Sequence, residues 1–431
     1  MSDYLQMHYR LKLFILFNVL LIEFFLTGYI DKKYEETVRR INLKILHLNA
    51  GNETGGGMYH ILRLLKKMKE IDSVQCMLGV FEKKELYQRA KDAKIPTIYF
   101  PNQTRFSLPL LRSIADFIKE AKITHVHTHG PRANVYMNYI NKMLPINWVV
   151  TIHSDPLFDF HDKGIYGKLL TQLHMNAIKN AKQIIVVSET FYPIMIEAGA
   201  KRENIVTIHN GIDFQAEISE EFFDMSNLYD LRKQFGFTNN DFLILQVARL
   251  EKVKGHHIAF QALAKLIHEE QKSSFHLLLV GDGSLREELS ELAKSLQIEN
   301  HVHFYGQRYD VNTFYKLADI TLLTSLSESF PYVLLESARA KTPVITTDVG
   351  DVRYLLVNED FGWKVPVNNP LAVMNALKDA YQLFQDNRLK IVGEKLYSYA
   401  SNYFSLDICV NDVYNVYKSM MQQEKNDEKF V

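Results

Sequence analysis

The sequence has few cysteines and no excess of charge of either sign. Its only cysteines, Cys76 and Cys409, lie far apart, which argues against a disulfide framework and favours a reducing, cytoplasmic compartment. Lysine plus arginine and aspartate plus glutamate both number 50, so the formal net charge is zero. A chain without a global positive field is not expected to bind nucleic acid. Any site for an anion must therefore be local.

Motifs of common nucleotide sites are absent as well. The chain contains neither a GxxxxGK[ST] phosphate loop nor a GxGxxG dinucleotide fingerprint. It also lacks low-complexity segments and short-period repeats. What it does have is length and apolar content, because 431 residues that are 47% hydrophobic suffice for two domains with separate cores.

From Asn42 onward, short apolar runs alternate with stretches of helical periodicity. This alternation is typical of βαβ units, which build parallel sheets covered by helices on both faces. A polar, irregular stretch from Asn210 to about Asn240 divides the runs into two groups. In the first group we expect strands at Leu43–Asn49, Val74–Val80, Thr97–Phe100, His125–His129, Trp148–His153, Ile184–Ser188 and Ile205–His209. In the second we expect Phe242–Ala248, Leu277–Val280, His303–Tyr305, Ile320–Thr324 and Pro343–Thr346.

The sequence therefore predicts an α/β fold with two Rossmann-like, doubly wound parallel sheets, in domains at residues 41–213 and 214–390. Residues 1–40 precede them as a hydrophobic segment. Within it, Leu13–Ile30 is long enough to span a bilayer, but Asn18 and Glu23 interrupt it, and a mid-membrane acid costs about 2.5 to 3.5 kcal/mol. A membrane anchor and an interfacial helix both remain open. Basic residues after the segment would keep the rest of the chain in the cytoplasm.

Two glutamates eight residues apart are the most informative motif of the second domain. Glu328 and Glu336 flank a short turn and an apolar run, between two predicted strands. If a helix begins near Pro331, Glu336 lies inside it and Glu328 lies on the loop before its positive end. Loops at the carboxyl edge of a parallel sheet are where α/β proteins place their ligands. We therefore expect one pocket to hold both acids.

Two cations lie where the predicted strand Phe242–Ala248 gives way to a helix. Arg249 and Lys254 near a helix N-terminus suit a diphosphate, although a solvated surface is the plain alternative. Two further loops also follow strands. One contains Gly281 and Gly283, and the other contains Asp310.

The first domain contributes glycines and histidines. Gly55–Gly57 follow the first strand, where they let the backbone approach a ligand and open a helix N-terminus suited to phosphate. His153 ends the fifth strand, as a hydrogen-bonded terminal residue or as a group that faces a ligand. His127 and His129 share one face of the fourth strand, which is the spacing of a zinc pair. No cysteine or clear third ligand lies nearby in the sequence, so we expect no metal there.

In their order along the chain, these motifs resemble those of glycosyltransferase family 4. The matches run from Asn42 to about Leu356 and comprise the Gly-Gly loop, the Thr-x-His, the Asn-Gly-Ile-Asp hinge, the Arg-x4-Lys-Gly and the E-x7-E. The resemblance implies the GT-B fold, whose two sheets face each other across a cleft, with residues 391–431 as a helix that crosses back to the first domain. It also implies a retaining transferase that moves a sugar from a nucleoside-diphosphate sugar to a glycan or lipid-linked acceptor, in cell-surface polysaccharide assembly.

The resemblance assigns a role to each motif residue. The implied catalytic residues are His153 and Glu328. The implied donor-binding residues are Arg249, Lys254, Gly281, Gly283, Asp310, Ser329, Phe330 and Glu336. The implied acceptor or loop residues are Gly55, Gly56, Gly57, His127 and His129. Because the chain has no Asp-x-Asp metal motif, side chains must neutralise the leaving diphosphate, and we expect no metal or other cofactor.

Other interpretations stay open. A catalytically silent sugar-nucleotide-binding subunit or a nucleotide-sugar 2-epimerase would share the two-domain architecture. A lysine cluster in the first domain, beside the hydrophobic N-terminal segment, favours an acceptor at the cytoplasmic face of a membrane, while a solvated helix face is the alternative. The cluster comprises Lys66, Lys67, Lys69, Lys83 and Lys84.

Overall fold

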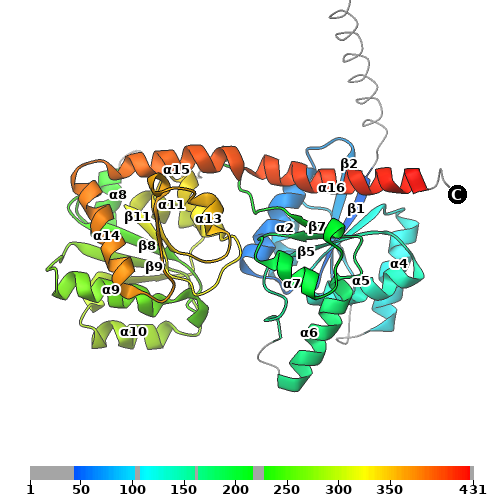
Figure 1. Cartoon of the computed structure of the whole chain (residues 1–431), viewed down its shortest axis with the longest axis horizontal. Helices are drawn as coiled ribbons and strands as arrows, with labels where there is room; N and C mark the ends of the chain where they lie inside the picture. The colour runs from blue at the N-terminus through cyan, green and yellow to red at the C-terminus, as the bar shows by residue number, and fades with distance from the viewer. Residues whose placement is uncertain (1–42, 102–106, 161–163, 217–227, 428–431) are drawn as a thin grey trace, which may run out of the picture.

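Two parallel β-sheets form the centres of two lobes (Figure 1). The computed structural model describes residues 43–101, 107–160, 164–216 and 228–427. Every pair of neighbouring strands in both sheets is parallel. The predicted α/β class with two Rossmann-like sheets is therefore confirmed.

The sheet of the first lobe has the strand order β3-β2-β1-β4-β5-β6-β7. Its strands are β1 (Leu43–Asn49), β2 (Val74–Val80), β3 (Thr97–Tyr99), β4 (His125–His129), β5 (Asn147–Ile152), β6 (Gln183–Val186) and β7 (Ile205–Thr207). Its helices are α2 (Gly55–Met68), α3 (Glu85–Asp92), α4 (Leu108–Glu120), α5 (Pro131–Met143), α6 (Gly164–Ile178), α7 (Phe191–Glu197) and the 3-10 turn η2 (Arg202–Asn204). The strand order reverses between β1 and β4, so the loops after these strands flank a crevice.

The sheet of the second lobe has the order β10-β9-β8-β11-β12-β13. Its strands are β8 (Phe242–Val247), β9 (Phe275–Val280), β10 (Val302–Gly306), β11 (Ile320–Leu323), β12 (Val344–Thr347) and β13 (Trp363–Val365). Its helices are α8 (Leu228–Gln234), α9 (His256–His268), α10 (Arg286–Ser295), α11 (Val311–Leu317), α12 (Tyr332–Arg339), α13 (Val352–Leu355) and α14 (Pro370–Gln385). Short 3-10 turns are η3 (Lys252–Lys254), η4 (Glu299–His301) and η5 (Glu359–Phe361). Here the order reverses between β8 and β11.

Apolar side chains on both faces of the strands explain why the sheets are covered twice. Leu46 and Leu48 of β1 pack with Trp148 in one core, whereas Leu43 and Ile45 pack into another core under α2. Successive residues of a strand point to opposite faces, so an almost continuous apolar run needs helices on both sides. Burying one such side chain contributes about 1.5 to 3 kcal/mol.

The last two helices join the lobes. α15 (Leu389–Tyr403) packs against α12 of the second lobe, and α16 (Leu406–Asp427) packs against α2 of the first. Figure 1 shows this pair running along one side of both lobes. Ile212, in the connection between the lobes, forms a parallel bridge with Ser405, where α15 gives way to α16. The chain therefore passes between the lobes twice, and the two passages touch.

The structure sharpens several predicted bounds. β5 ends at Ile152, so His153 lies just after the strand rather than in it. β13 and α13 were not predicted. In the described part of the chain, no helix combines the length and hydropathy that crossing a bilayer requires. The predicted segment 13–30 lies outside the described residues, so its membrane role stays a prediction.

Candidate active site

The predicted site loops follow the carboxyl ends of strands in both lobes. Side-chain hydrogen bonds connect loops of the first lobe to loops of the second. Ser329 Oγ, from the loop before α12, donates to the carbonyl oxygen of His153 at 3.2 Å. Asn210 Nδ2 donates to the carbonyl oxygen of Phe330 at 2.8 Å. The loop after β5 and the loop after β11 therefore face each other. This places His153 beside the first half of the two-glutamate motif.

Glu328 holds a cation from the neighbouring loop of its own lobe. Lys254 Nζ lies 2.6 Å from Glu328 Oε1, and Ser325 Oγ donates to the same oxygen at 2.7 Å. Both charged side chains are largely shielded, with 19% and 13% of their surface exposed. A lysine ammonium has three donors, so two remain for a ligand.

The turn that carries Lys254 depends on a glycine. Gly255 has a φ of +63°, and a Cβ atom there would lie 2.1 Å from the carbonyl oxygen of Thr324, directly after β11. No side chain fits so close to a backbone oxygen. The close approach of the two loops is what brings Lys254 to Glu328.

The side chain of Arg249, the second predicted cation, is exposed and makes no hydrogen bond or ion pair with any described residue. It lies on the loop after β8, which packs against the loop after β9. Gly281 permits this packing, because a Cβ atom there would lie 2.0 Å from the carbonyl oxygen of Ala248. Asp310, in contrast, receives two hydrogen bonds from Arg308, at 2.8 and 2.7 Å, which lower the pKa of its carboxyl group.

Glu336, the other half of the motif, pairs with an arginine that the sequence analysis missed. α12 begins at Tyr332, as predicted, and Arg63 of α2 reaches Glu336 Oε1 from the first lobe at 2.7 Å. The Arg63 guanidinium also lies over the Tyr332 ring, 4.6 Å from its centroid. Tyr315 donates to Glu336 Oε2 at 3.3 Å. The two glutamates thus have different cations, one from each lobe.

The glycine-rich loop of the first lobe adjoins α12. A Cβ atom on Gly56 would lie 3.6 Å from the Tyr332 ring. Gly57 lies against Glu53, an acid that the sequence analysis did not select, and burial raises the pKa of Glu53 while a hydrogen bond with Asn49 opposes the rise. A second acid, Asp159, has its pKa raised to about 6 by burial and, more weakly, by Glu53. Desolvated acids beside a loop are candidates for contact with an acceptor.

Three histidines, His47, His127 and His129, stack behind His153. His129 bonds to His153 at 3.0 Å and to His47 at 3.0 Å, and His127 lies against both inner rings. Burial lowers the pKa of His47 to about 3 and holds the pKa values of His127, His129 and His153 well below the usual range. The imidazoles are therefore neutral at neutral pH.

The missing third partner of the H-x-H pair is His47, which the parallel pairing of β1 and β4 sets opposite His127. His47 is thus far from this pair in the sequence but adjacent to it in the fold, and sequence spacing alone did not reveal it. His47, His127 and His129 each offer one ring nitrogen, and these three nitrogens lie within 4.8 Å of one another. The three residues could therefore hold a metal ion. Their ring nitrogens are, however, already hydrogen-bonded to protein groups. The prediction of no metal stays a prediction.

Phe330, a predicted site residue, and Asp351, which was not predicted, are buried between the lobes. Phe330 packs its ring between His209 and Phe404, with centroids 4.8 and 4.9 Å away, so its side chain belongs to the core. Asp351, which was not predicted, is fully buried and accepts from His209 Nε2 at 2.8 Å and from the Glu189 N–H at 2.5 Å. These contacts tie the loop after β12 to the first lobe.

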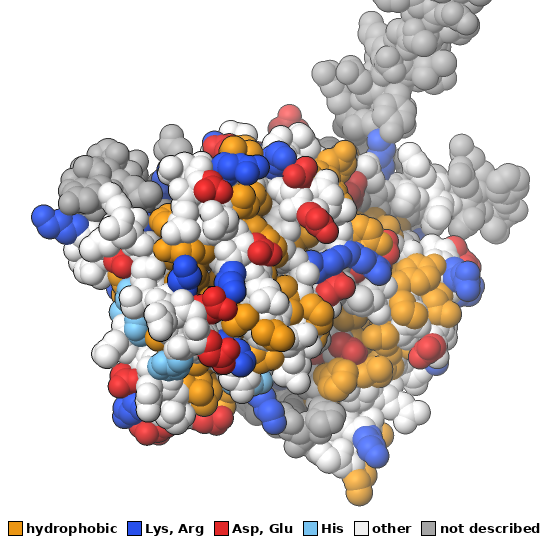
Figure 2. All heavy atoms as spheres, turned by 60° about the vertical axis from the view of Figure 1, so that its left-hand side comes forward, with side chains coloured by type: hydrophobic (Ala, Val, Ile, Leu, Met, Phe, Trp, Pro, Cys, Tyr) orange, Lys and Arg blue, Asp and Glu red, His pale blue; other side chains and the backbone are white. Residues whose placement is uncertain are grey.

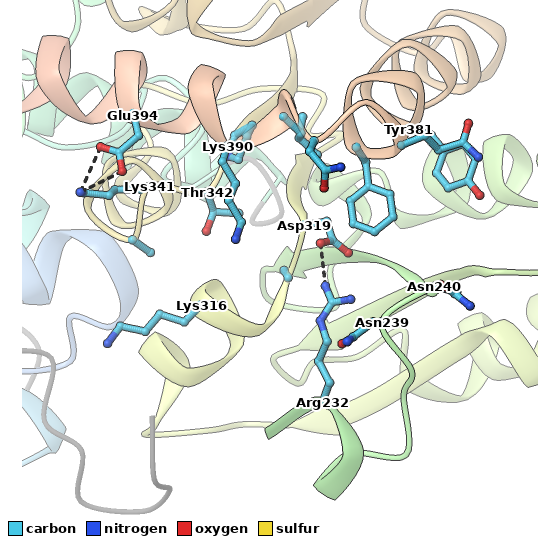
Figure 3. Close-up of a pocket in the computed structure, with 17 residues that line it drawn as sticks. Arg232, Asn239, Asn240, Lys316, Asp319, Lys341, Thr342, Tyr381, Lys390 and Glu394 are labelled. Carbon is cyan, nitrogen blue, oxygen red and sulfur yellow. Dashed lines mark hydrogen bonds and ion pairs between the residues drawn. The ribbon is translucent and has the colours of Figure 1, made fainter. Parts of the chain in front are cut away.

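An open hollow of about 1120 Å³ lies elsewhere on the second lobe (Figure 3). Asp319 and Pro343, which line it, directly precede β11 and β12, so it lies at the amino edge of the sheet. Its charges are largely paired within the protein, as in Arg232–Asp319 at 2.6 Å. None of the predicted site residues lines it. The hollow is therefore distinct from the candidate site.

Two family models match the chain, one for each lobe. The model described as Glycosyltransferase Family 4 matches residues 54–216, and the model described as Glycosyl transferases group 1 matches residues 229–403. Together they span every strand of both sheets except β1.

Curated relatives and solved structures agree with these models. The N-acetyl-α-D-glucosaminyl L-malate synthase of Bacillus anthracis is 26% identical over 347 residues, which cover 77% of this chain and 86% of the relative. The UDP-Gal:α-D-GlcNAc-diphosphoundecaprenol α-1,3-galactosyltransferase of Escherichia coli is 24% identical over 316 residues, covering 72% and 79%. The crystal structure of Anabaena Alr3699/HepE in complex with UDP has a TM-score of 0.75 at 21% identity and covers 88% of this chain and all of that one. The chain therefore belongs to glycosyltransferase family 4 and is a glycosyltransferase with the GT-B fold.

Proposed function

We propose that the protein transfers a sugar, with retention of its anomeric configuration, from a nucleoside-diphosphate sugar to a glycan or lipid-linked acceptor in cell-surface polysaccharide assembly. The observation that carries the proposal is the ion pair between Lys254 and Glu328, positioned opposite His153 by the contact of Ser329 with the His153 carbonyl group. Cation and acid thus lie opposite the backbone of His153, where the two lobes adjoin.

The cations suit the leaving group. Among the described residues Lys254 Nζ pairs with Glu328 alone, which leaves two of its donors, and the Arg249 guanidinium is exposed on the loop directly before it. As the sugar departs, negative charge develops on the diphosphate, and donors fixed in advance stabilise it without reorganisation. Lys254 and Arg249 can act on the diphosphate in this way with or without a metal ion.

Glu336 suits the ribose of the donor. A carboxylate offers about four lone-pair positions, and Arg63 and Tyr315 occupy one on each oxygen. Two positions remain for the vicinal hydroxyls of a ribose. Under this proposal Arg63 stays in place when the donor binds, and it holds the carboxylate toward the nucleoside.

The acceptor would lie against the first lobe. Glu53 and Asp159 border the glycine-rich loop and the loop after β5, where an acceptor hydroxyl would meet them. The relatives named above include an enzyme whose acceptor is a diphosphoundecaprenol-linked sugar, which supports a lipid-linked acceptor. Of the lysines predicted to meet a membrane, Lys67 pairs with Glu70 and Asp407, and Lys84 pairs with Glu82. On the face drawn in Figure 2, acidic and basic side chains are interspersed without a field of one sign.

Incubation with a panel of UDP- and GDP-sugars and lipid-linked acceptors tests the proposal. The Anabaena structure was also solved with UDP-glucose, so UDP-glucose is the first donor to try. We expect release of the nucleoside diphosphate together with a new glycosidic bond, whose configuration NMR of the product reports. Lys254→Ala should abolish most of this turnover. Lys265→Ala is the matched control, because Lys265 also pairs with a glutamate, on the solvent-exposed side of α9. Inversion of configuration, or full turnover by Lys254→Ala, would contradict the proposal.

A further inference from the structure

A chain of five hydrogen bonds runs from the interior of the first lobe to His153. Thr151 Oγ1 bonds to His127 Nε2 at 2.6 Å, and His127 Nδ1 bonds to the Tyr417 hydroxyl at 2.5 Å. The same hydroxyl lies 3.4 Å from His47 Nε2. The chain then continues from His47 Nδ1 to His129 Nε2 at 3.0 Å and from His129 Nδ1 to His153 Nε2 at 3.0 Å. It links α16 to the active site.

The protons along this chain must all point the same way. Each imidazole is buried and neutral, because desolvation disfavours its charged form, so each carries one N–H and one lone pair. A ring that donates on one side therefore accepts on the other. Reversing one ring alone would set two donors or two lone pairs against each other. Two states let every member donate in the same direction along the whole chain. A state in which the Tyr417 hydroxyl accepts from both His127 and His47 leaves the Tyr417 proton without an acceptor in the chain.

Thr151 distinguishes the two states. In the described part of the chain, its hydroxyl has His127 Nε2 as its sole hydrogen-bond partner. If Thr151 donates, every member of the chain is satisfied. If His127 donates instead, the Thr151 proton has no acceptor, and a buried unpaired donor costs about 1 to 3 kcal/mol. The direction that begins at Thr151 is therefore the stable one.

We propose that Thr151 and Tyr417 set the tautomer of His153, so that His153 Nδ1 carries the proton and presents an N–H donor to the cleft. Following the chain from Thr151, His127 donates to Tyr417, Tyr417 to His47, His47 to His129, and His129 to the lone pair of His153 Nε2. The proton of His153 is then left on Nδ1, which bonds to no described residue. Thr151, Tyr417 and the three inner histidines are positioning residues.

For the reaction, the tautomer decides what His153 can do. This consequence rests on the proposed function. An Nδ1–H donates a hydrogen bond to an oxygen of the donor sugar, whereas the other tautomer would offer a lone pair and could accept a proton. His153 is thus a neutral donor that orients the sugar, and it is not a general base. Helix α16, which packs against α2 of the first lobe, supplies the tyrosine on which that property depends.

Nitrogen NMR of the protein labelled with ¹⁵N-histidine tests the tautomer directly, without any substrate. The two ring nitrogens of a neutral histidine resonate far apart according to which one carries the proton. The signals of His153 are those that disappear in His153→Gln. We expect a protonated Nδ1 in the wild type and in Thr151→Ser, which keeps the hydroxyl. In Thr151→Val, which keeps the shape but loses the donor, and in Tyr417→Phe, which interrupts the chain, this preference should disappear.

Activity gives the second measurement. With an active donor, Thr151→Val should lower kcat about three- to tenfold, the equivalent of one hydrogen bond, and Thr151→Ser should restore it. Thermal unfolding of each variant shows whether it has folded. A protonated Nε2 in wild-type His153 would overturn the proposal, and so would an unchanged tautomer in folded Thr151→Val. A stoichiometric metal ion in the purified protein would overturn it as well, because a metal on His47, His127 and His129 takes the lone pairs that the chain uses. Since the spectrum needs no donor, a failed transferase assay would leave the tautomer result standing.

Discussion

The two walls of the cleft use different chemistry. The wall from the first lobe, apart from Arg63 beside Glu336, consists of neutral imidazoles that are buried and bonded to one another behind His153. The wall from the second lobe carries full charges, in the Lys254–Glu328 pair and in the exposed Arg249. Desolvation removes charge from a buried histidine, so these imidazoles can orient a ligand but cannot neutralise one. Orientation and charge compensation are thus divided between the lobes, and contacts such as Ser329 to His153 bring them together.

The largest expected effect lies on the charged wall. Glu328→Gln and Lys254→Ala should each lower kcat about 10²- to 10³-fold, as expected when one preorganised electrostatic contact is lost. Because the two side chains act as a pair, the double variant should be little worse than the poorer single variant. Initial rates at saturating donor measure this cycle. If the two losses simply multiplied, the ion pair would not act as a unit, and the second wall would need another description.

The buried, neutral histidines of the first lobe should make the free energy of unfolding depend on pH. Burial lowers the pKa of His60 to about 4, against about 6.5 in the unfolded chain. Below pH 6.5 the unfolded state therefore binds a proton that the folded state does not, and stability falls as the pH drops toward 4. The slope is about 1.4 kcal/mol per pH unit for one such group.

Histidines of the second lobe contribute to the same slope, because burial lowers the pKa values of His256 and His303 to about 4 as well. The contribution of His60 is therefore the difference between the pH slopes of wild type and a His60 variant. Urea unfolding of wild type and His60→Gln at pH 6.5 and 5 should give a shallower slope in the variant. Equal slopes would mean that His60 is not held neutral.

A smaller effect is expected where the walls meet. Arg63→Met keeps apolar packing on Tyr332 but removes the ion pair with Glu336 and the cation–π contact. Since both side chains keep about a fifth to a quarter of their surface exposed, we expect a loss of about 1 to 3 kcal/mol of stability and a raised KM for the donor. Arg63→Lys, which keeps the charge, is the matched variant. An unchanged KM in Arg63→Met would show that Glu336 needs no partner from the first lobe.

Most of the fold could be predicted from the sequence, because strands buried on both faces appear as apolar runs. The exceptions are short. β13 has three residues, one of them the exposed Lys364, and α13 has four, so neither carries a periodic pattern. The predicted strand Trp148–His153 instead runs from Asn147 to Ile152, because polar residues at a strand end leave the periodicity undefined.

The site could be predicted where its residues belong to local motifs on loops that follow strands. Lys254 and Glu328 lie on loops that directly follow strands, and the pairing of those strands brings them together. Arg63 lies 273 residues from Glu336, and nothing in α2 marks it as a partner of α12. The histidine chain needs the register of β1 with β4, which sets His47 opposite His127, and a tyrosine from the last helix. These are relations of the folded chain and have no local signal.

The smallest effect should come from a second ion pair far from both walls. Lys341 pairs with Glu394 at 3.0 Å beside the hollow of Figure 3, and both side chains are about half exposed. Exposed pairs of this kind contribute roughly 0 to 1 kcal/mol. Lys341→Ala should therefore leave kcat and KM unchanged and shift the unfolding free energy by less than about 1 kcal/mol, measured by urea titration. The hollow lies at the amino edge of the sheet, while ligands of such sheets bind at the carboxyl edge. A clear loss of turnover in this variant would show that the opposite edge also takes part in the reaction, and the division of labour between the two walls would be incomplete.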